Sequence, residues 1–470
     1  MIYSRFSILI IAIASLWVST ASLAGDIFTA NDYKARRAAL AEKISNDEML
    51  VVFASEHKIY SEDVNYPYHP DVTLRYLTGA TQEDTIYVLR KSNDVVTEYL
   101  FTKAPNLLHE KWVGKIASVE SIKNITGLSN VYKNDGSDGV TFAEIATMDG
   151  IKTLWLERGN DPKREDFSPA QRFANDLRET HPNLEIKTFR PLTQKMREIK
   201  SANEILALRK AIDISVAGHV AAMRRALTAD YEYQIEAAME QVFADMGAES
   251  EGYPSIVGAG RNSTILHYET NREAVPEGSL VLIDAAAEYQ GYSADITRTF
   301  PVDGTFSDAQ KDIYQIVYDA QEAAFALSKP GANFRDMTIA SFDVIAEGLL
   351  KLGLITQKTP NQIRLYAYHG LGHGIGLNVH DPNPYGNLQP GAVYTIEPGV
   401  YVNKNFVLND PAFLALDPQD QAKIKQALDK YDTIGVRIED DLLITKDGYE
   451  NLSVAAPRSI KDIEAWMAKK

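Results

Sequence analysis

The sequence predicts an α/β domain at the N-terminus, followed by a larger α+β domain that contains an internal duplication. Three observations support this prediction. With 470 residues, the chain is too long for one ordinary domain and suits two. Helical and strand patterns alternate over residues 26–195, and an order of helix, helix and strands then begins near residue 201 and again near residue 307. We therefore place the domains at residues 26–195 and 196–470.

The composition is that of an ordinary globular protein, with 45% hydrophobic and 24% charged residues. This excludes a disordered, collagen-like or polytopic membrane chain. The 48 basic and 64 acidic residues give a net charge of -16, which repels polyanions, so no nucleic-acid partner is expected. Because the chain has no cysteine, it cannot form a disulfide, a thiolate metal site, a cysteine nucleophile or a lipoprotein anchor.

Residues 1–24 have the pattern of a signal peptide. Arg5 is the only charge before an apolar run from Phe6 to Val18, and Ser22 and Ala24 are small residues at the two positions that a signal peptidase inspects. We expect cleavage after Ala24 and a periplasmic or secreted protein. The alternative is an uncleaved anchor helix, but the apolar run is shorter than the ~20 residues that a membrane span needs.

The predicted N-terminal domain begins with a helical pattern from Tyr33 to Ile44. The segment Arg190-Pro191-Leu192 is interpreted as the linker to the second domain. Short apolar runs typical of buried strands occur at residues 49–54, 85–89 and 152–156.

The second domain begins with a capping box formed by Ser201 and Glu204, and the same signal recurs at Ser307 and Gln310. Each box opens a helix with an apolar stripe. A second helix follows in each half, and then a region of strand signals. Two such halves would bury one curved antiparallel sheet under four helices. The second helices are expected at residues 231–246 and 334–352, and the strands at 253–300 and 365–445.

Two carboxylates flank a predicted β-hairpin in the first half. An apolar run ends in Asp284, and Asp295 follows after a Gln290-Gly291 turn signal. A turn centred between Tyr289 and Gln290 would make Asp284 and Asp295 direct cross-strand partners, about 5 Å apart on one face. Two carboxylates in that position need a cation, a shared proton or solvent. A solvated surface hairpin is the alternative, and the apolar run before Asp284 disfavours it.

A glycine-rich segment from His369 to Asp381 contains His369, His373 and His380, three of the nine histidines. Its four alternate glycines prevent a stable helix, which excludes the helical two-histidine zinc motif. Glycines at this density let the backbone approach a ligand or metal closely. A single histidine is usually an ordinary core or surface residue, whereas three with this spacing indicate a site.

Two further carboxylates, Glu397 and Glu439, lie within apolar strand patterns. The acidic residues after Glu439 can be solvated, but apolar neighbours make this less expected for Glu439 itself. The four carboxylates Asp284, Asp295, Glu397 and Glu439 match the charge of two divalent cations, and His373 adds one nitrogen. A set this rich in hard oxygen ligands favours Mn²⁺ over metals that prefer thiolates. Two such ions bridged by carboxylates form a hydrolytic centre.

The sequence resembles the pita-bread metallopeptidases, and among them the Xaa-Pro aminopeptidases, or aminopeptidase P family. The resemblance rests on four strings in the second domain: IDAAAEYQGYSADITRTFPVDG, HGLGHGIGLNVHD, TIEPGVY and GVRIEDD. It extends to the first domain through RRAAL near Arg36 and SEDVNYPYHPDVTLRYLTG. It therefore implies an aminopeptidase P-type α/β domain followed by a pita-bread domain with pseudo-two-fold duplication.

The resemblance also implies a role for each candidate residue. Asp295 and Glu439 would bridge two metal ions, and Glu397 would also be the proton shuttle. His267 would act near the scissile peptide, and His380 would contact the substrate carbonyl. Asp63 would help hold the substrate amine, either in the same chain or from a neighbouring subunit. The implied metal ligands are Asp284, Asp295, His373, Glu397 and Glu439, and the implied prolyl-pocket residues are His369, Tyr401 and Arg437.

The expected activity is release of the first residue from peptides with proline in second position, by a homo-oligomer (dimer or tetramer). The alternatives are a prolidase, which takes only dipeptides, and a non-catalytic relative that binds another protein. Retention of all five implied ligands disfavours the latter, and a metal-free creatinase is disfavoured for the same reason. Departures from the family pattern are Ala286 in place of glycine, a short segment at residues 382–389 without an arginine, and a long segment at residues 403–432.

Overall fold

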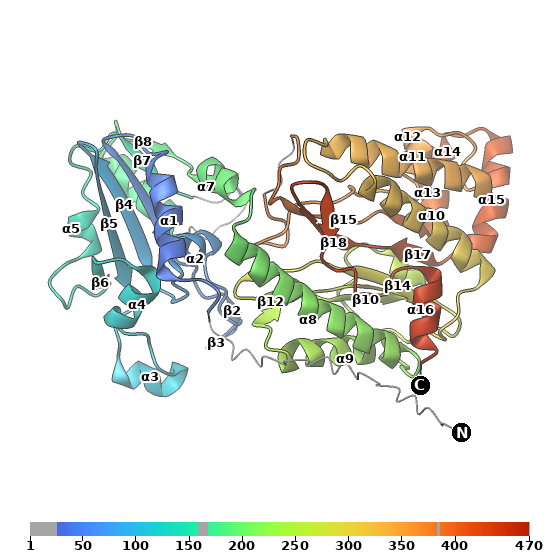
Figure 1. The fold of residues 1–470 in the computed structure, drawn as a ribbon, viewed down its shortest axis with the longest axis horizontal. Helices are drawn as coiled ribbons and strands as arrows, with labels where there is room; N and C mark the ends of the chain where they lie inside the picture. The colour runs from blue at the N-terminus through green and yellow to red at the C-terminus, as the bar shows by residue number, and fades with distance from the viewer. Residues whose placement is uncertain (1–25, 158–167, 383–385, 470) are drawn as a thin grey trace, which may run out of the picture.

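The computed structural model describes residues 26–157, 168–382 and 386–469. Figure 1 shows a smaller N-terminal domain beside a larger C-terminal domain that is crossed by long helices. The expected signal peptide, residues 1–24, lies outside the described residues. Within those ranges, no helix combines the length and the apolar character that a membrane crossing requires.

The N-terminal domain is built on a six-stranded mixed sheet with the order β6-β5-β4-β1-β7-β8. Alternate residues of its central strand β1 face opposite sides, so Leu50 joins one apolar cluster and Val51 another. Helices α1, α2 and α4 pack with the first cluster, and α6 packs with the second. The strands are β1 (Glu48–Phe53), β4 (Ile86–Ser92), β5 (Val95–Thr102), β6 (Val131–Lys133), β7 (Thr153–Trp155) and β8 (Glu185–Lys187). The helices are α1 (Ala30–Ala41), α2 (Val72–Thr78), α3 (Leu107–Val113), α4 (Val119–Thr126), α5 (Phe142–Ile145) and α6 (Pro169–Thr180), and a small hairpin comprises β2 (Ile59–Ser61) and β3 (Val64–Asn65).

The predicted linker is wrong in one respect, because the segment from Arg190 to Arg197 forms helix α7. Pro191 lies in the first turn, where a missing N–H costs nothing and the fixed φ angle suits a helix. Arg36 of α1 fixes the N-terminal domain to the next one: its guanidinium donates to the Tyr292 hydroxyl (3.2 Å) and lies 3.6 Å from Glu204.

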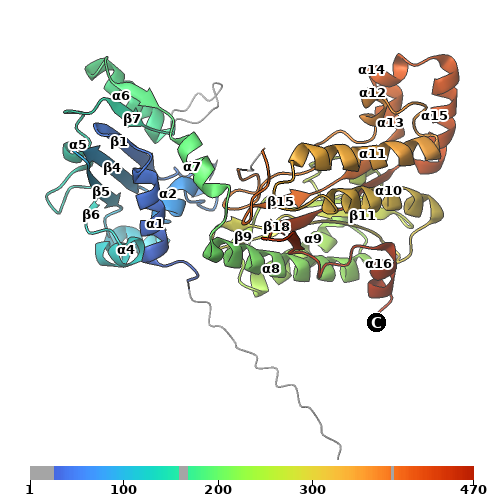
Figure 2. The same cartoon turned by 45° about the horizontal axis from the view of Figure 1, so that its top comes forward.

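The C-terminal domain has the predicted pair of long helices in each half. The capping boxes at Ser201 and Ser307 are both formed, and Gly353 ends the last of these helices in the left-handed conformation. In Figures 1 and 2 the strands lie between the α8–α9 pair and the α10–α11 pair, and residues of all four helices share the largest apolar core. The helices are α8 (Ala202–Ala226), α9 (Glu232–Asp245), α10 (Asp308–Phe325), α11 (Phe334–Leu352), α12 (Pro360–Ile363), α13 (Lys404–Asn409), α14 (Pro411–Leu414), α15 (Pro418–Tyr431) and α16 (Ile460–Met467), with a 3₁₀ turn at Gly260–Thr264.

The strands of this domain pair in several small sheets rather than in one continuous curved sheet. The principal sheet of each half is three-stranded, β10-β11-β14 in the first and β15-β18-β19 in the second. The expected strand region of the second half is also interrupted, because the long segment at residues 403–432 folds as α13, α14 and α15. The strands are β9 (Ser250–Glu251), β10 (Ile256–Ala259), β11 (Leu280–Asp284), β12 (Ala287–Tyr289), β13 (Tyr292–Ser293), β14 (Thr297–Pro301), β15 (Val393–Ile396), β16 (Gly399–Val402), β17 (Ile434–Arg437), β18 (Asp440–Ile444) and β19 (Tyr449–Asn451).

The predicted register of the first-half hairpin is wrong, because the partner of Asp284 lies two residues further along the chain than expected. Asp284 lies opposite Thr297, not opposite Asp295. The chain reverses at Gln290 and Gly291, whose φ angles of 48° and 82° are both left-handed. A two-residue turn of this kind matches the twist of the flanking strands, so it centres one residue later than the sequence suggested. Asp295 consequently lies in the short break between β13 and β14.

Candidate active site

A pocket of about 450 Å³ opens in the C-terminal domain and receives residues from both halves of the duplication. Most of the residues predicted from the sequence line it. Asp284 ends β11, while Glu397 and Glu439 each lie in the short break between two successive strands, β15 and β16 or β17 and β18. The predicted residues that line the pocket are His267, Asp284, Asp295, His369, His373, His380, Glu397, Arg437 and Glu439.

The glycine-rich segment lies along β15, and this places His373 in the pocket. The His373 carbonyl accepts from the Thr395 amide at 2.8 Å, so segment and strand are close neighbours. A Cβ atom on Gly372 would lie 2.1 Å from the Thr395 carbonyl oxygen. Only glycine permits this approach, which explains the glycine at position 372.

The carboxylates converge on His373. Its Nε2 atom lies 3.3 Å from Oδ2 of Asp295 and 3.7 Å from Oε1 of Glu397. One potential ligand atom from each of Asp295, His373 and Glu439 falls within 4.8 Å of the others, a spacing suited to a single metal ion. The Tyr253 hydroxyl lies 2.6 Å from Oδ1 of both Asp284 and Asp295 and so joins the two aspartates.

The hydrogen bonding of the Glu439 carboxylate indicates whether this set of residues fits a cation. Its Oε2 atom accepts from the Thr297 hydroxyl at 2.7 Å, whereas Oε1 is buried and has no hydrogen-bond partner among the described residues. A buried carboxylate oxygen without a partner is costly, and a metal ion removes that cost. The donor set therefore fits divalent cations with a preference for oxygen ligands.

The pKa values in the cluster also show that its buried charges need a positive partner, either a proton or a cation. Burial is the main cause that raises the pKa of Glu397 to about 8, and it also raises the pKa of Asp295. Burial alone would lower the pKa of His373, but its contacts with Asp295 and Glu397 raise it to about 9. Without a cation, Glu397 and His373 therefore hold protons near neutral pH.

Arg437, Tyr401 and His369 form one hydrogen-bonded group beside the carboxylates. The Tyr401 hydroxyl lies 2.8 Å from Nε2 of His369 and accepts from Nη1 of Arg437 at 2.8 Å. The Nη2 atom of Arg437 donates to Oδ2 of Asp284 at 2.6 Å. Tyr401 is buried and does not line the pocket directly, so it acts on the pocket wall through its two partners.

His380 and His267 lie at the exposed rim of the pocket. The His380 ring lies 4.0 Å from the His373 ring between centroids. Burial and the nearby His373 lower the pKa of His380, which favours a neutral imidazole. Asp63 lies elsewhere: it is exposed in the turn between β2 and β3, and a single chain does not bring it to this pocket.

Sequence reasoning missed several residues that shape the site. Tyr253 and Thr297 bond to the carboxylates directly; Tyr253 lies outside the recognised strings, and Thr297 lies within the first of them but was not singled out. Asp381, at the end of the glycine-rich segment, is buried and pairs with Arg197 and Lys200 near the start of the C-terminal domain. These contacts join residues far apart in the chain, so no local signal reveals them.

The fold and the carboxylate-histidine pocket define a metallopeptidase. The family model "Metallopeptidase family M24" matches residues 207–446, and "Aminopeptidase P, N-terminal domain" matches residues 33–150. The chain belongs to the aminopeptidase P family of these enzymes.

Relatives and solved structures agree with this assignment over almost the full length. The chain is 32% identical to the Xaa-Pro aminopeptidase of Escherichia coli (strain K12), covering 93% of this chain and 97% of the relative. It is 33% identical to Xaa-Pro aminopeptidase 1 of Streptomyces coelicolor, covering 94% of this chain and 88% of the relative. Aminopeptidase P from E. coli with the inhibitor Pro-Leu superposes with a TM-score of 0.81 at 31% identity, covering 94% of this chain and 98% of that one. Proline aminopeptidase P II from Yersinia pestis also gives a TM-score of 0.81, at 32% identity, with coverage of 94% and 100%.

Proposed function

We propose that Asp284, Asp295, His373, Glu397 and Glu439 hold two divalent cations, preferably Mn²⁺, in an enzyme that acts on peptides with proline in second position. As a member of this family the chain is a Xaa-Pro aminopeptidase, and it removes the residue that precedes that proline. The observation that carries the metal assignment is the buried, unpartnered Oε1 atom of Glu439 among three other carboxylates.

The five residues suit two cations by charge and by ligand type. Four carboxylates balance two divalent ions, and the single imidazole leaves the set rich in hard oxygen donors. Asp295 and Glu439 are the proposed bridging ligands. When bound, the ions supply an activated water and charge stabilisation at the carbonyl under attack.

The other residues of the pocket bind and orient the peptide and move protons. His267 and His380 stand at the rim, where their ring N–H groups can donate to the carbonyl oxygen of the first residue. Glu397 lies within 3.7 Å of both His369 and His373, and its carboxyl can accept a proton and pass it to the prolyl nitrogen.

Proline recognition is assigned to the group formed by His369, Tyr401 and Arg437. The prolyl nitrogen lacks a hydrogen and its ring fixes the φ angle, so the pocket must accept a ring rather than an amide donor. Arg437 is held by Tyr401 and Asp284, and this rigid guanidinium can donate to the peptide beyond proline. The segment at residues 382–389 is short and lacks the arginine that some relatives have there. We therefore expect the preference for residues after proline to be the part of the specificity that differs most from those relatives.

A peptide panel tests the specificity. We expect release of the first residue from Xaa-Pro-Xaa tripeptides, and little turnover of Xaa-Ala-Xaa or N-acetylated peptides. Cleavage of Xaa-Pro dipeptides with tripeptides left intact would assign the chain to the prolidases instead.

Two further proposals concern the protein outside the pocket. Export follows from the signal pattern of residues 1–24, and it predicts a mature N-terminus at Gly25. Oligomerisation is proposed because Asp63 is exposed and does not line the pocket of its own chain, so it would act on the substrate amine of a neighbouring subunit. N-terminal sequencing of the exported protein tests the first proposal. Loss of activity on dilution to monomers, and with Asp63→Asn, tests the second.

A further inference from the structure

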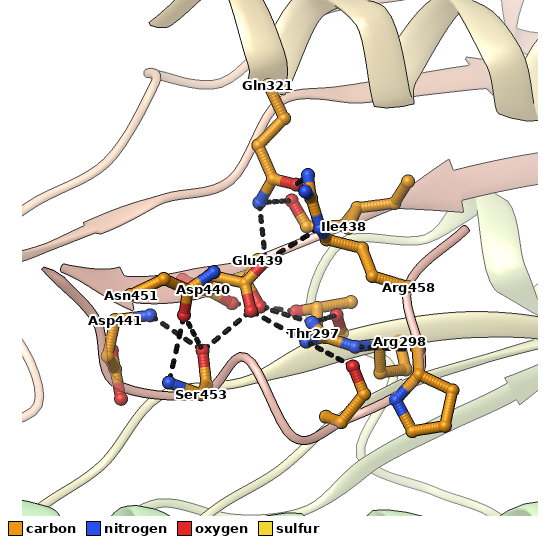
Figure 3. A network of polar contacts seen from close by, with 12 residues as sticks. Thr297, Arg298, Gln321, Ile438, Glu439, Asp440, Asp441, Asn451, Ser453 and Arg458 are labelled. Carbon is orange, nitrogen blue, oxygen red and sulfur yellow. Dashed lines mark hydrogen bonds and ion pairs between the residues drawn. The ribbon is translucent and has the colours of Figure 1, made fainter. Parts of the chain in front are cut away.

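A glutamine behind the pocket links the two strands that deliver the glutamates. Gln321 lies on α10, is fully buried, and points toward the strands in Figure 3. Its Nε2 atom lies 2.9 Å from the carbonyl oxygen of Ile396 and 3.1 Å from that of Ile438. The two segments run antiparallel, with Ile396 paired to Asp440 and Gly399 paired to Arg437, and the glutamates lie in the break between these pairs.

Each of these carbonyls belongs to the residue that immediately precedes a proposed metal ligand. Ile396 precedes Glu397, and Ile438 precedes Glu439. Both glutamates lie in breaks between strands, where their backbone amides donate to the carbonyls of Leu371 and Thr297 rather than to each other's segment. Gln321 adds a link across this break, because one amide group contacts both of the carbonyls that precede the glutamates.

The glutamine is itself held in place from two sides. Its Oε1 atom accepts from Nη1 of Arg458 at 2.7 Å, and its Nε2 atom lies 3.0 Å from Oδ2 of Asp440. The other oxygen of Asp440 accepts from Nη2 of Arg298 and from the Ser453 hydroxyl, each at 2.6 Å. Figure 3 shows these residues joined by polar contacts around Glu439.

Arg298 extends the layer to the backbone of Glu439 itself. Its Nη1 atom donates to the Glu439 carbonyl at 2.6 Å, and its guanidinium is fully buried. Because all of these polar groups are satisfied, the layer is rigid and has one favoured arrangement. A shift of Gln321 would therefore displace the glutamates rather than be absorbed by the network.

The first half of the duplication has a comparable link. His219 on α8 is fully buried, and its Nε2 atom lies 2.9 Å from the carbonyl oxygen of Ala285. Ala285 immediately follows Asp284, another proposed ligand. In each half, a polar side chain on the first long helix thus holds a peptide carbonyl adjacent to a carboxylate ligand.

We propose that Gln321 is a positioning residue of the metal centre, setting the distance between Glu397 and Glu439 through the carbonyls that precede them. This inference rests on the proposed function, because it takes these glutamates as metal ligands. Outer-shell partners that orient a ligand typically change metal affinity by about 10–100-fold when removed. Gln321 acts through the backbone of two ligands at once, so the expected loss lies in that range.

The test uses Gln321→Met, which keeps the length of the side chain and removes its donor group. A second variant, Gln321→Glu, keeps the acceptor that Arg458 requires. The matched control is Gln315→Met, at an exposed position of the same helix. Mn²⁺ affinity is measured by calorimetry on metal-free protein, and the visible spectrum of the Co²⁺-loaded protein reports the ligand geometry.

We expect both Gln321 variants to bind Mn²⁺ at least tenfold more weakly and to show a changed Co²⁺ spectrum, while the control matches the wild type. Lower thermal stability with unchanged affinity and an unchanged spectrum would assign Gln321 a role in the fold alone and overturn the proposal. Failure of both variants to fold would also overturn it.

A further variant separates this inference from the proposed function. Glu439→Gln removes a proposed ligand and should abolish binding of at least one Mn²⁺ ion. If Glu439→Gln binds Mn²⁺ normally, the metal assignment itself is wrong. If Glu439→Gln loses metal while both Gln321 variants keep wild-type affinity, only the positioning role is wrong.

Discussion

Neutralising Glu397 should stabilise the metal-free protein while destroying the enzyme. Glu397 lies in a cluster of buried carboxylates, and burial raises its pKa from 4.5 to about 8. A folded-state pKa above the unfolded value means that this group favours folding most at low pH. That contribution is lost as the pH rises from about 4.5 through about 8. Glu397→Gln cannot titrate, so it does not suffer this loss.

The magnitude follows from the same two pKa values. Between low pH and pH 7.5, the raised pKa of Glu397 lowers the free energy of unfolding by at most about 4 kcal/mol. This is an upper bound, because neighbouring carboxyls titrate together with Glu397 and share the effect. Within the described residues, the Glu397 side chain forms no hydrogen bond, and His369 and His373 lie 3.7 Å from its oxygens. The amide therefore removes the charge without breaking a strong hydrogen bond.

The assay is urea unfolding of chelator-treated protein at pH 5 and at pH 8. The variant should match the wild type at pH 5 and exceed it by a few kcal/mol at pH 8, with turnover lost in the presence of Mn²⁺. Glu120→Gln, at an exposed position, is the control and should shift stability by less than about 0.5 kcal/mol at either pH. A Glu397→Gln variant that is less stable than the wild type at pH 8 would refute the reasoning.

Three further predictions address the ligands, the rim and the layer behind the site. Asp295→Asn keeps the size of the proposed bridging ligand but removes its charge. Metal content should fall toward one ion or none, with near-total loss of turnover. Full activity with two ions bound would contradict the bridging role. His380→Ala should retain both metals and lower kcat by roughly 10²-fold or more, because it removes a donor to the reacting carbonyl; loss of metal would make His380 a ligand instead. Arg298→Met removes the nearer of two charged partners of the buried Asp440 carboxylate and leaves only Arg458 at 3.8 Å. It should cost about 3–5 kcal/mol in urea unfolding, and a cost below about 1 kcal/mol would show that the pair is not structural.

The sequence predicted the fold class well because its signals are local. Two capping boxes, with Ser201 and Ser307 as their first residues, mark the start of each half, and the structure forms both. The predicted register of the hairpin between Asp284 and Asp295 was wrong. The turn requires a left-handed φ angle at Gln290, and glutamine is not a residue type that predicts this conformation.

The candidate site was predictable to the extent that its residues lie in recognisable strings. Nine of the predicted residues line one pocket, and Tyr401 touches two of them. The sequence could not reveal how the halves meet. Gln321 bonds to Ile396 and Ile438, 75 and 117 positions away, and only the folded chain brings such groups together. Asp63 shows a further limit, because it is exposed in the turn between β2 and β3 and does not line the pocket.

The most direct measurement of the central claim is the number of Mn²⁺ ions bound per chain at saturation, determined by metal analysis of the protein after dialysis against a known free concentration. The proposed ligand set predicts two ions per chain in the wild type, with hydrolysis of a Xaa-Pro-Xaa peptide rising as the sites fill. Full hydrolysis of the peptide at one ion per chain, or with none, would contradict the two-cation centre.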